Sequence, residues 1–568
     1  MSSKPDLNNL TSQTPTRRVG VETWYHVEDD QTHHFEETSK SGTPKNSLAV
    51  LPERSASEPE CVESLIQRIP PERQWIRKSP VSQQFFLDSG LAITFDTTDG
   101  QEWSGSVKIA SAECNHFNQL LQSLDQGDIT AKNLLCPKEG EAKIFKGGQS
   151  RKPFQTRCHE NYETLVASGM WLIAYRFMIH IILAFGKIAK LLTSGCILLL
   201  IFSRWPQSKR RSPITSEEAV ALMDQAPNFI RRTVLLVAQL AHQPTVWLIR
   251  WTGKHIAFRT QRQNLSAFLI TRPVLFGTGH LAEDGRYFLG HAANFSRGMV
   301  GTGTAAAESP VFLYSHWVKA CCQGVFQTRN AGRDLLFSHQ RLQIGLSDTN
   351  SSNETTCLKV CMTALIIEMI EKGSADSFPV FHSPLRALRE VNADWYLVKN
   401  YPTSFGKLSA IDIQRIYWNA ANRYVSSLTA ENATPYHPVL KDWMRIIERV
   451  EKVQESGIEK KDDGVSVDWI TKRIMIESVS PTKGLAAKCD LAASYHHLPL
   501  QKNNRSEKPN KENVHHETSH DYPESRVGRT HFIQTHQRCK GEIEIGWNYA
   551  IKSDDSSTEL IPFESIRD

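Results

Sequence analysis

The sequence predicts a mixed α+β fold, because short strand-like segments occur in the first 115 residues and amphipathic helices occur in the second half. Segments 17–28, 91–96 and 106–114 alternate polar and apolar residues, as half-buried strands do. Helical periodicity appears at 357–371, 410–428 and 438–456. A chain of 568 residues is also long enough for a large core and roughly two to four structural units.

The first strands carry isolated carboxylates. In RRVGVETWYHVE, residues 17–28, one face holds valines and a threonine, and the other holds Gly20, Glu22 and Trp24. LAITFD ends in Asp96, and SVKIASAEC ends with Glu113 before a cysteine. Carboxylates gathered on one sheet face can hold a metal ion beside a nucleotide, whereas the alternative is that they are solvated strand faces.

The helix expected at 357–371 has the clearest pattern. Apolar residues recur at three- and four-residue spacing, which predicts one apolar face: Leu358, Cys361, Met362, Leu365, Ile366 and Met369. Ser351 to Glu354 matches a capping box, and Gly373 stands where a C-cap belongs. A late strand is expected at 542–551.

The most apolar segment, residues 171–204, allows two interpretations. Its length permits a membrane span, but Arg176, His180, Lys187 and Lys190 interrupt it, and each cation at bilayer depth costs about 2.5–3.5 kcal/mol on insertion scales. A basic flank, WPQSKRRSP, follows and suits a cytoplasmic membrane surface. Two interpretations therefore remain open. The segment forms helices that are buried or face a partner, or it associates with a membrane.

Composition limits the functional classes. A net charge of +5 with both signs interspersed gives no reason to expect nucleic-acid binding. The eleven cysteines show no zinc-type spacing, and the polar N-terminal segment lacks the apolar region of a signal peptide, so we expect a cytoplasmic protein with reduced thiols. Residues 1–16 and 500–525 have the polar composition of disordered segments.

Several stretches resemble one family, in the correct order along the chain. They are RRVGVETWY, LDSGLAITFD, ASAEC, CHENY (158–162), FLITRPVLFGTGHL (268–281), QTRN (327–330), DTNSSNETTCLKVCMTALIIEMIEKG, SPLRALREVNAD (383–394), DIQRIYWNAA (412–421), VDWITKR (467–473) and the segment around Trp547. Together they resemble the Pup ligase and Pup deamidase/depupylase family, relatives of glutamine synthetase. The HENY-like motif therefore belongs to the fold, and the apolar run after it is an insertion.

The resemblance implies a glutamine-synthetase-like domain with a curved, mainly antiparallel sheet backed by helices. That domain would span residues 17–455, with an apolar and basic insertion at about 168–262. A smaller C-terminal domain at 456–568 would help to bind the modifier. Segments 17–28, 89–114 and 341–356 should then lie along one sheet face.

The function implied is ATP-dependent ligation of the C-terminal glutamate of a small Pup-like protein to substrate lysines through an acyl phosphate. The alternatives are a deamidase or depupylase of the same fold, and a catalytically degenerate member that acts as a binding or membrane-tethered scaffold. Segment 171–204 is a further candidate contact with a membrane or a partner.

Carried over by motif position, the catalytic aspartate is Asp96. The magnesium ligands are Glu22 and Glu102, and the nucleotide contacts are Ser111, Arg329 and Trp547.

The sequence also departs from the family pattern. Ala92 and Thr94 replace an arginine and a metal-side tyrosine, Trp24 replaces the second glutamate of the first motif, and the loop at 330–334 differs. Counting forward from Asp96 gives Glu102 as the second metal ligand, whereas counting back from ASAEC gives Lys108. A lysine at this position would oppose a metal ion through its like charge.

Overall fold

The computed structural model describes the folded body and most of its connections. The described residues are 17–29, 74–77, 84–87, 89–98, 102–135, 142–147, 158–204, 228–282, 284–303, 309–321, 331–374, 378–456, 467–479, 484–498, 542–545, 549–553 and 558–562. The segments expected to be disordered, 1–16 and 500–525, lie outside them.

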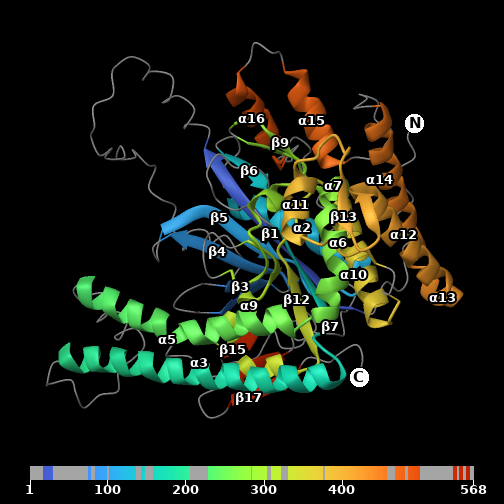
Figure 1. Cartoon of the computed structure of the whole chain (residues 1–568). Helices are drawn as coiled ribbons and strands as arrows, with labels where there is room; N and C mark the ends of the chain where they lie inside the picture. Colours follow the sequence, from blue (N-terminus) through green and yellow to red (C-terminus); the bar gives the residue numbers. More distant parts are fainter. Residues whose placement is uncertain are drawn as a thin grey trace, which may run out of the picture.

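A ten-stranded, mainly antiparallel sheet forms the centre of the protein (Figure 1). Its order is β10-β11-β12-β7-β1-β5-β4-β3-β2, with β6 pairing along the outer part of β1. Only β10 and β11, among the described neighbours, run parallel. The strands are β1 (Val19–Asp29), β2 (Gln74–Arg77), β3 (Gln84–Leu87), β4 (Ala92–Thr98), β5 (Glu102–Ala110), β6 (Ala142–Lys146), β7 (Cys158–Leu165), β10 (Gly298–Gly301), β11 (Pro310–Leu313) and β12 (His339–Ile344). Strands from all three segments expected on one sheet lie in it, with β7 between β12 and β1, and this confirms the mainly antiparallel α+β fold.

One face of this sheet forms the core. Val19, Val21 and Tyr25 of β1 are buried, as are Ile93 and Phe95 of β4, because alternate strand residues point to the same side. Helices α2 (Phe117–Leu135) and α10 (Asn353–Glu371) pack behind the sheet, and α6 (Arg259–Thr271) packs on α10. The opposite face is therefore left to polar side chains.

Helix α10 is more deeply buried than its spacing predicts. Fifteen of its 19 residues are buried, including all six of the predicted apolar face, so burial extends beyond that face. The reason is its position, because α2, α6, α12 (Ala410–Ser426) and α14 (Tyr436–Ser456) all contact it. Its N-cap is Ser352, whose side chain accepts a hydrogen bond from the Thr355 amide, one residue later than predicted. Gly373 has the left-handed φ of 73° expected after a helix end.

Shorter elements complete the body. They are α7 (Pro273–Phe276), β8 (His280–Leu281), β9 (Tyr287–Phe288), α8 (His291–Phe295), α9 (Ser315–Cys321), a 3₁₀ helix η5 (Ala331–Leu336), α11 (Pro384–Asn392), β13 (Asn400–Thr403), β14 (Gly406–Ser409), α13 (Ala430–Ala433), α15 (Asp468–Ser478) and α16 (Leu485–Ser494). A separate sheet contains β15 (Glu542–Ile545), β16 (Tyr549–Ser553) and β17 (Thr558–Pro562). The late strand expected at 542–551 is thus two antiparallel strands.

The apolar segment forms half of a long helical hairpin. Helix α3 (Gly169–Arg204) runs beside α5 (Asn228–His255), and the pair extends past the edge of the body (Figure 1). In the part of the chain that the structure describes, one helical stretch, Gly169–Cys196, has the length and composition of a membrane span, and 28% of its most apolar window is buried.

Candidate functional site

Strands β1, β5, β7 and β12 place a row of polar side chains on the face of the sheet opposite the core. Pairing sets Glu22 opposite His159 on β7 and Ala110 on β5. We call this the polar sheet face, and its central residues are Glu22, Trp24, Lys108, His159, Asn161, Arg341 and Gln343. Every second residue of each strand contributes its side chain to this face. In β1, the valines point into the core, so Glu22 and Trp24 point to the opposite side of the sheet.

The Glu22 carboxylate is the centre of this face. Its Oε2 lies 3.4 Å from Lys108 Nζ and 3.6 Å from His159 Nδ1. Its Oε1 accepts a hydrogen bond from Arg341 Nη2 and lies 3.4 Å from Gln343 Nε2. Both carboxylate oxygens are therefore already held by side chains of this protein.

The neighbouring cations keep Glu22 ionised although it is buried. Burial alone would raise the pKa of Glu22, but the charges of Lys108 and Arg341, with the His159 hydrogen bond, hold the pKa well below its usual value.

His316 on α9 also faces this region, and burial lowers its pKa well below the usual value, with the Arg341 charge adding to the effect. His316 is therefore neutral near pH 7.

Aromatic rings border the Glu22 cluster. The Trp24 ring meets His159 edge-to-face at 4.8 Å between centroids, and Lys108 Nζ lies 5.5 Å from the Trp24 ring centre. Trp24 therefore restricts the positions open to His159 and Lys108, and it helps to hold Lys108 beside Glu22.

Glu22 and Glu102, the two predicted metal ligands, stand at separate positions in the sheet. Ala110 lies opposite Glu22, and Glu102 stands at the other end of β5. Eight residues of strand separate them, which is about 26 Å at 3.3 Å per residue. Lys108, the other possibility left open by the sequence, is the residue that lies beside Glu22.

A magnesium ion does not fit at Glu22. Lys108 and Arg341 occupy the two carboxylate oxygens that would bind the ion, and their charges oppose a second cation. Within the described residues, no three His, Cys, Asp or Glu side chains are grouped to hold a metal.

The other predicted site residues have different outcomes. Ser111 is buried, and its hydroxyl accepts a hydrogen bond from the Val21 amide at 2.9 Å and donates one to the Ala112 carbonyl at 2.8 Å. This hydroxyl thus ties β1 to the end of β5. Asp96 lies on β4 in a bulge between Phe95 and Thr97. Arg329 and Trp547, and the side chains of Asp96 and Glu102, lie outside what the structure describes.

Within CHENY, adjacent residues serve opposite faces. His159 joins the polar sheet face, whereas Glu160 is fully buried in the core. Arg272 Nη1 donates to Glu160 Oε2 at 2.8 Å, and Ser347 Oγ donates to Oε1 at 2.5 Å. Burial would raise the pKa of Glu160, but Arg272 and Lys359 lower it. Glu160 is therefore a buried structural anion.

A second polar cluster, which sequence reasoning did not single out, joins α15 to the body. Asp468 accepts hydrogen bonds from Asn350 Nδ2 (3.0 Å), Ser351 Oγ (2.6 Å) and Tyr495 OH (2.9 Å). Lys359 Nζ donates to Asn350 Oδ1 at 2.9 Å. In the sequence, this cluster is marked only by the polar run DTNSS before a helix, and such a run by itself is typical of a loop.

The charges around Glu22 suit an anion better than a metal cation. Around Glu22, two side-chain cations and a histidine balance one carboxylate. The remaining positive charge can attract phosphate or carboxylate groups, which accept charge-assisted hydrogen bonds from arginine and lysine.

Sequence comparison finds relatives among Pup--protein ligases. A family model described as Pup-ligase protein matches residues 17–506. The Pup--protein ligase of Nakamurella multipartita is 29% identical over 225 residues, 39% of this chain and 45% of that protein. The Pup--protein ligase of Geodermatophilus obscurus is 24% identical over 338 residues, 55% of this chain and 69% of that protein. In the first of these alignments the chain spans less than half the length of the relative.

Structural comparison finds the same fold. A crystal structure of the complex between Prokaryotic Ubiquitin-like Protein Pup and its Ligase PafA aligns with a TM-score of 0.54 at 15% identity, over 97% of this chain and 90% of that one. A structure of the Pup ligase PafA in complex with ADP aligns with a TM-score of 0.50 at 14% identity, over 94% and 96%. At these identities the likeness concerns the fold.

Proposed function

Because the chain belongs to the Pup-ligase family, we propose that it acts in protein pupylation as an ATP-dependent carboxylate–amine ligase. In this reaction the C-terminal glutamate of a Pup-like protein takes the γ-phosphoryl group of ATP on its side-chain carboxylate, and ADP leaves. A substrate lysine amine then displaces phosphate, loses a proton and forms an isopeptide bond. The observation that carries the proposal is the family match across most of the chain.

The polar sheet face supports the proposal as the place where the anionic reactants bind. Arg341 and Lys108 would attract the phosphates of the nucleotide or the carboxylate of the modifier. Asp96 would take the proton from the attacking lysine amine, since a carboxylate beside the nucleophile is the base this step requires. Arg329 and Trp547 stay proposed nucleotide contacts. No step is assigned to magnesium at Glu22.

The decisive experiment is conjugation by the purified full-length protein. Pup with a C-terminal glutamate, ATP with magnesium and a lysine-bearing protein are incubated, and intact mass spectrometry follows the target. We expect a mass increase equal to Pup minus one water, lost in the Asp96→Asn variant. If Pup with a C-terminal glutamine loses ammonia while no conjugate forms, the deamidase alternative is correct instead.

A second candidate function is favoured by the Glu22 cluster itself. A family member whose metal-binding carboxylate is neutralised by Lys108 would keep a binding surface and lose turnover. For such a scaffold we expect calorimetric binding of Pup or ATP without any conjugate. If Pup and ATP both fail to bind at saturating concentration, neither candidate function survives.

A further inference from the structure

We propose that the α3–α5 hairpin docks on an anionic phospholipid bilayer, and that the pocket at its base receives one lipid. The proposal concerns the hairpin alone, and it does not depend on conjugation of Pup. It rests on the unpartnered apolar side of the hairpin, on the distribution of charge along both helices, and on the lining of the pocket.

Helix α3 is apolar around most of its circumference, and over residues 171–196, whose burial is described, its buried residues form one stripe. The covered residues follow alternating spacings of four and three: Tyr175, Ile179, Ile182, Gly186, Ala189 and Thr193. Large apolar side chains elsewhere on the helix remain exposed, among them Phe177 at 64%, Ile188 at 53% and Leu191 at 72%. A soluble protein rarely exposes a contiguous apolar surface of this kind without a partner.

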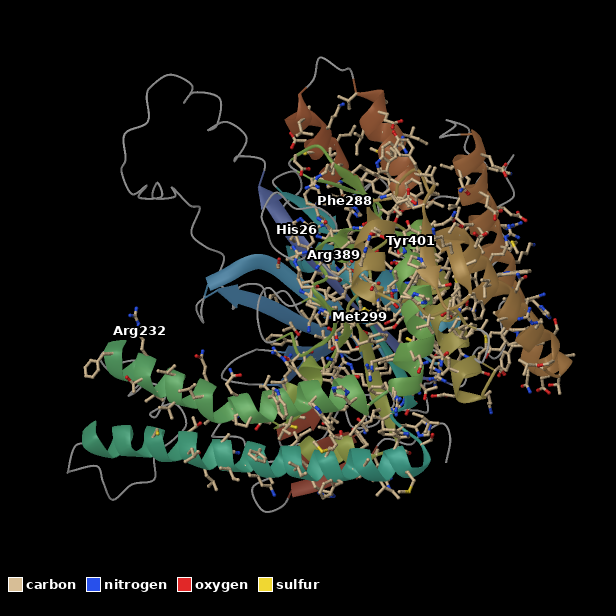
Figure 2. All side chains as sticks on the ribbon, viewed as in Figure 1. His26, Arg232, Phe288, Met299, Arg389 and Tyr401 are labelled. Atoms are coloured by element: carbon tan, nitrogen blue, oxygen red, sulfur yellow. The ribbon has the colours of Figure 1, made fainter. Side chains whose placement is uncertain are left out.

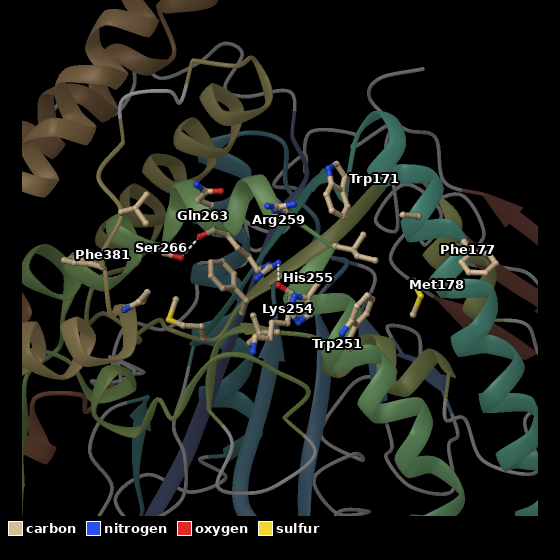
Figure 3. Close-up of a pocket in the computed structure, with 18 residues that line it drawn as sticks. Trp171, Phe177, Met178, Trp251, Lys254, His255, Arg259, Gln263, Ser266 and Phe381 are labelled. Atoms are coloured by element: carbon tan, nitrogen blue, oxygen red, sulfur yellow. Dashed lines mark hydrogen bonds between the residues drawn. The ribbon is translucent and has the colours of Figure 1, made fainter. Parts of the chain in front are cut away.

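The exposed residues of both helices meet in one pocket of about 780 Å³ (Figure 3). Trp171, Phe177 and Met178 enter it from α3, and Trp251 and Lys254 enter from α5. The same helix faces continue away from the pocket. On α3 they carry Ile181, Phe185, Ile188 and Leu192, and on α5 they carry Trp247, Leu240, Leu236 and Phe229. One side of the hairpin is thus apolar from the pocket to its far end.

Charge identifies the partner. The sequence has no Asp or Glu between Glu163 and Glu217, and none between Asp224 and Glu283. Exposed cations accompany the apolar stripes, including Lys187 on α3, and Lys254 and Arg232 on α5, the last at the end far from the body (Figure 2). An apolar surface surrounded by cations is complementary to anionic headgroups over acyl chains. A second copy docking on this side would bring like charges together.

The lining of the pocket, like the surface of the hairpin, combines apolar side chains with cations. Its apolar walls include Met299 and Phe312, and its polar residues include Lys254, Arg259 and Arg262. Arg259 lies 4.9 Å from the Trp171 ring centre, which places a guanidinium at an aromatic wall. Among the described residues that line the pocket, none is acidic. A single acyl chain with a phosphate at its end matches both parts of the lining.

The hairpin is expected to lie in the membrane plane. Helix α3 has 36 residues, about 54 Å at 1.5 Å per residue, whereas the hydrocarbon core is about 30 Å thick. Lys187 and Lys190 interrupt its middle, and crossing would carry the charged connection at 205–227 through the bilayer. In-plane binding leaves the exposed Lys187 near the headgroups, where its long side chain can reach the phosphates.

The test is flotation of the full-length protein with vesicles, in the absence of Pup and nucleotide. The vesicles are phosphatidylcholine alone or phosphatidylcholine with phosphatidylglycerol. We expect binding to the anionic vesicles that weakens with salt. A variant with Ser at positions 185, 188 and 192, in place of Phe185, Ile188 and Leu192, should no longer bind the anionic vesicles. A second variant, Lys187→Glu with Lys254→Glu, should bind them about fivefold more weakly for each cation replaced. Val398→Ser with Phe405→Ser is the matched control, because these exposed apolar residues lie outside the hairpin.

Pocket occupancy is measured separately by native mass spectrometry with phosphatidylglycerol. We expect one bound lipid in the wild type and loss of that lipid in an Arg259→Glu variant that still floats with vesicles. Equal binding to both vesicle types, or unchanged binding by the Ser variant, would overturn the proposal. So would self-association that the Ser variant abolishes in lipid-free solution, because the occupant would then be a second copy.

Discussion

At the scale of single residues, Lys108 determines the chemistry of the polar sheet face. Its Nζ lies 3.4 Å from Glu22 Oε2, where the family resemblance implied a metal. The sequence allowed two alignments at this position, because the segment between Asp96 and ASAEC differs in length from the family motif. Strand register places Lys108 beside Glu22, and that register follows from pairing with β1, which composition cannot reveal.

Replacing Lys108 tests this assignment. We expect Lys108→Glu to create a two-carboxylate site that binds Mn²⁺, which wild type does not bind at Glu22, since the added charge attracts a cation. The variant should lose about 1–3 kcal/mol of stability without metal, because Glu22 loses a partner. Calorimetry with Mn²⁺ measures the binding, and Lys108→Gln is the control. Equal Mn²⁺ affinity in all three proteins would contradict the assignment.

Glu371 gives a pH-dependent prediction. It is paired with Arg17 at 2.5 Å, and it accepts hydrogen bonds from Thr164 Oγ1 and from the Leu165 amide. Burial would raise the pKa of Glu371, but Arg17 and these hydrogen bonds lower it to about 2. Because the folded pKa is depressed, the stabilisation is complete above the unfolded value near 4.5 and is lost as pH falls towards about 2.

We therefore expect Glu371→Gln to destabilise the protein by about 2–4 kcal/mol at pH 7. The difference from wild type should shrink steadily below pH of about 4.5. Urea unfolding at several pH values measures it, with Glu390→Gln as the control, because Glu390 makes an i,i+4 pair with the exposed Arg386. A difference independent of pH would show that the Glu371 charge is unimportant.

At the scale of elements, the sequence predicted regular pieces well where local pattern decides them. Helices α12 and α14 fall within a few residues of the expected ranges, and β1 and β4 show the expected alternation. Burial of α10 on all sides was not predictable, because it depends on α2, α6, α12 and α14 surrounding it. The hairpin shape of 542–553 was missed because GWN at 546–548 does not interrupt the apolar pattern clearly.

Two glycines test how helix ends and interiors differ. At Gly373 a β-carbon would meet no atom within 4 Å, but φ is +73°. Gly373→Ala should therefore cost about 1 kcal/mol through backbone strain alone. At Gly195, inside α3 and equally open, Ala should instead stabilise by about 0.5–1 kcal/mol. Denaturant unfolding compares the two, and equal effects would refute the conformational explanation.

At the scale of the whole molecule, the Asp468 cluster links the C-terminal helices to the core. Asp468 contacts Asn350 and Ser351 next to α10, and Trp469 is fully buried. The hydrogen bonds of Asp468 to residues more than a hundred positions earlier were not predicted, since no local pattern encodes them. The division into a large domain and a smaller domain from residue 456 stays a prediction.

Removing this link should loosen residues 468–498 before the rest unfolds. Asp468→Ala leaves the Asn350 amide and the Ser351 hydroxyl without their acceptor, which should cost about 2–4 kcal/mol locally. Hydrogen exchange followed by mass spectrometry should show faster exchange in α15 and α16 and unchanged exchange in β1 and β7. Uniform acceleration throughout the body would mean that the cluster stabilises the whole fold equally. Asp442→Ala, an exposed pair member on α14, is the control.

The central position of β1 also has a consequence for the order of events during synthesis. β1 can pair with β7 once residue 165 has left the ribosome, but β12, the next strand of the sheet, ends at residue 344. At roughly 5–20 residues per second, about 10–35 s pass between the two. Helix α3 is made in that interval, before α9 and η5 exist to cover its base. The nascent chain thus exposes its most apolar helix before the body is complete. We expect chaperones, or a nearby bilayer, to bind this helix during that interval.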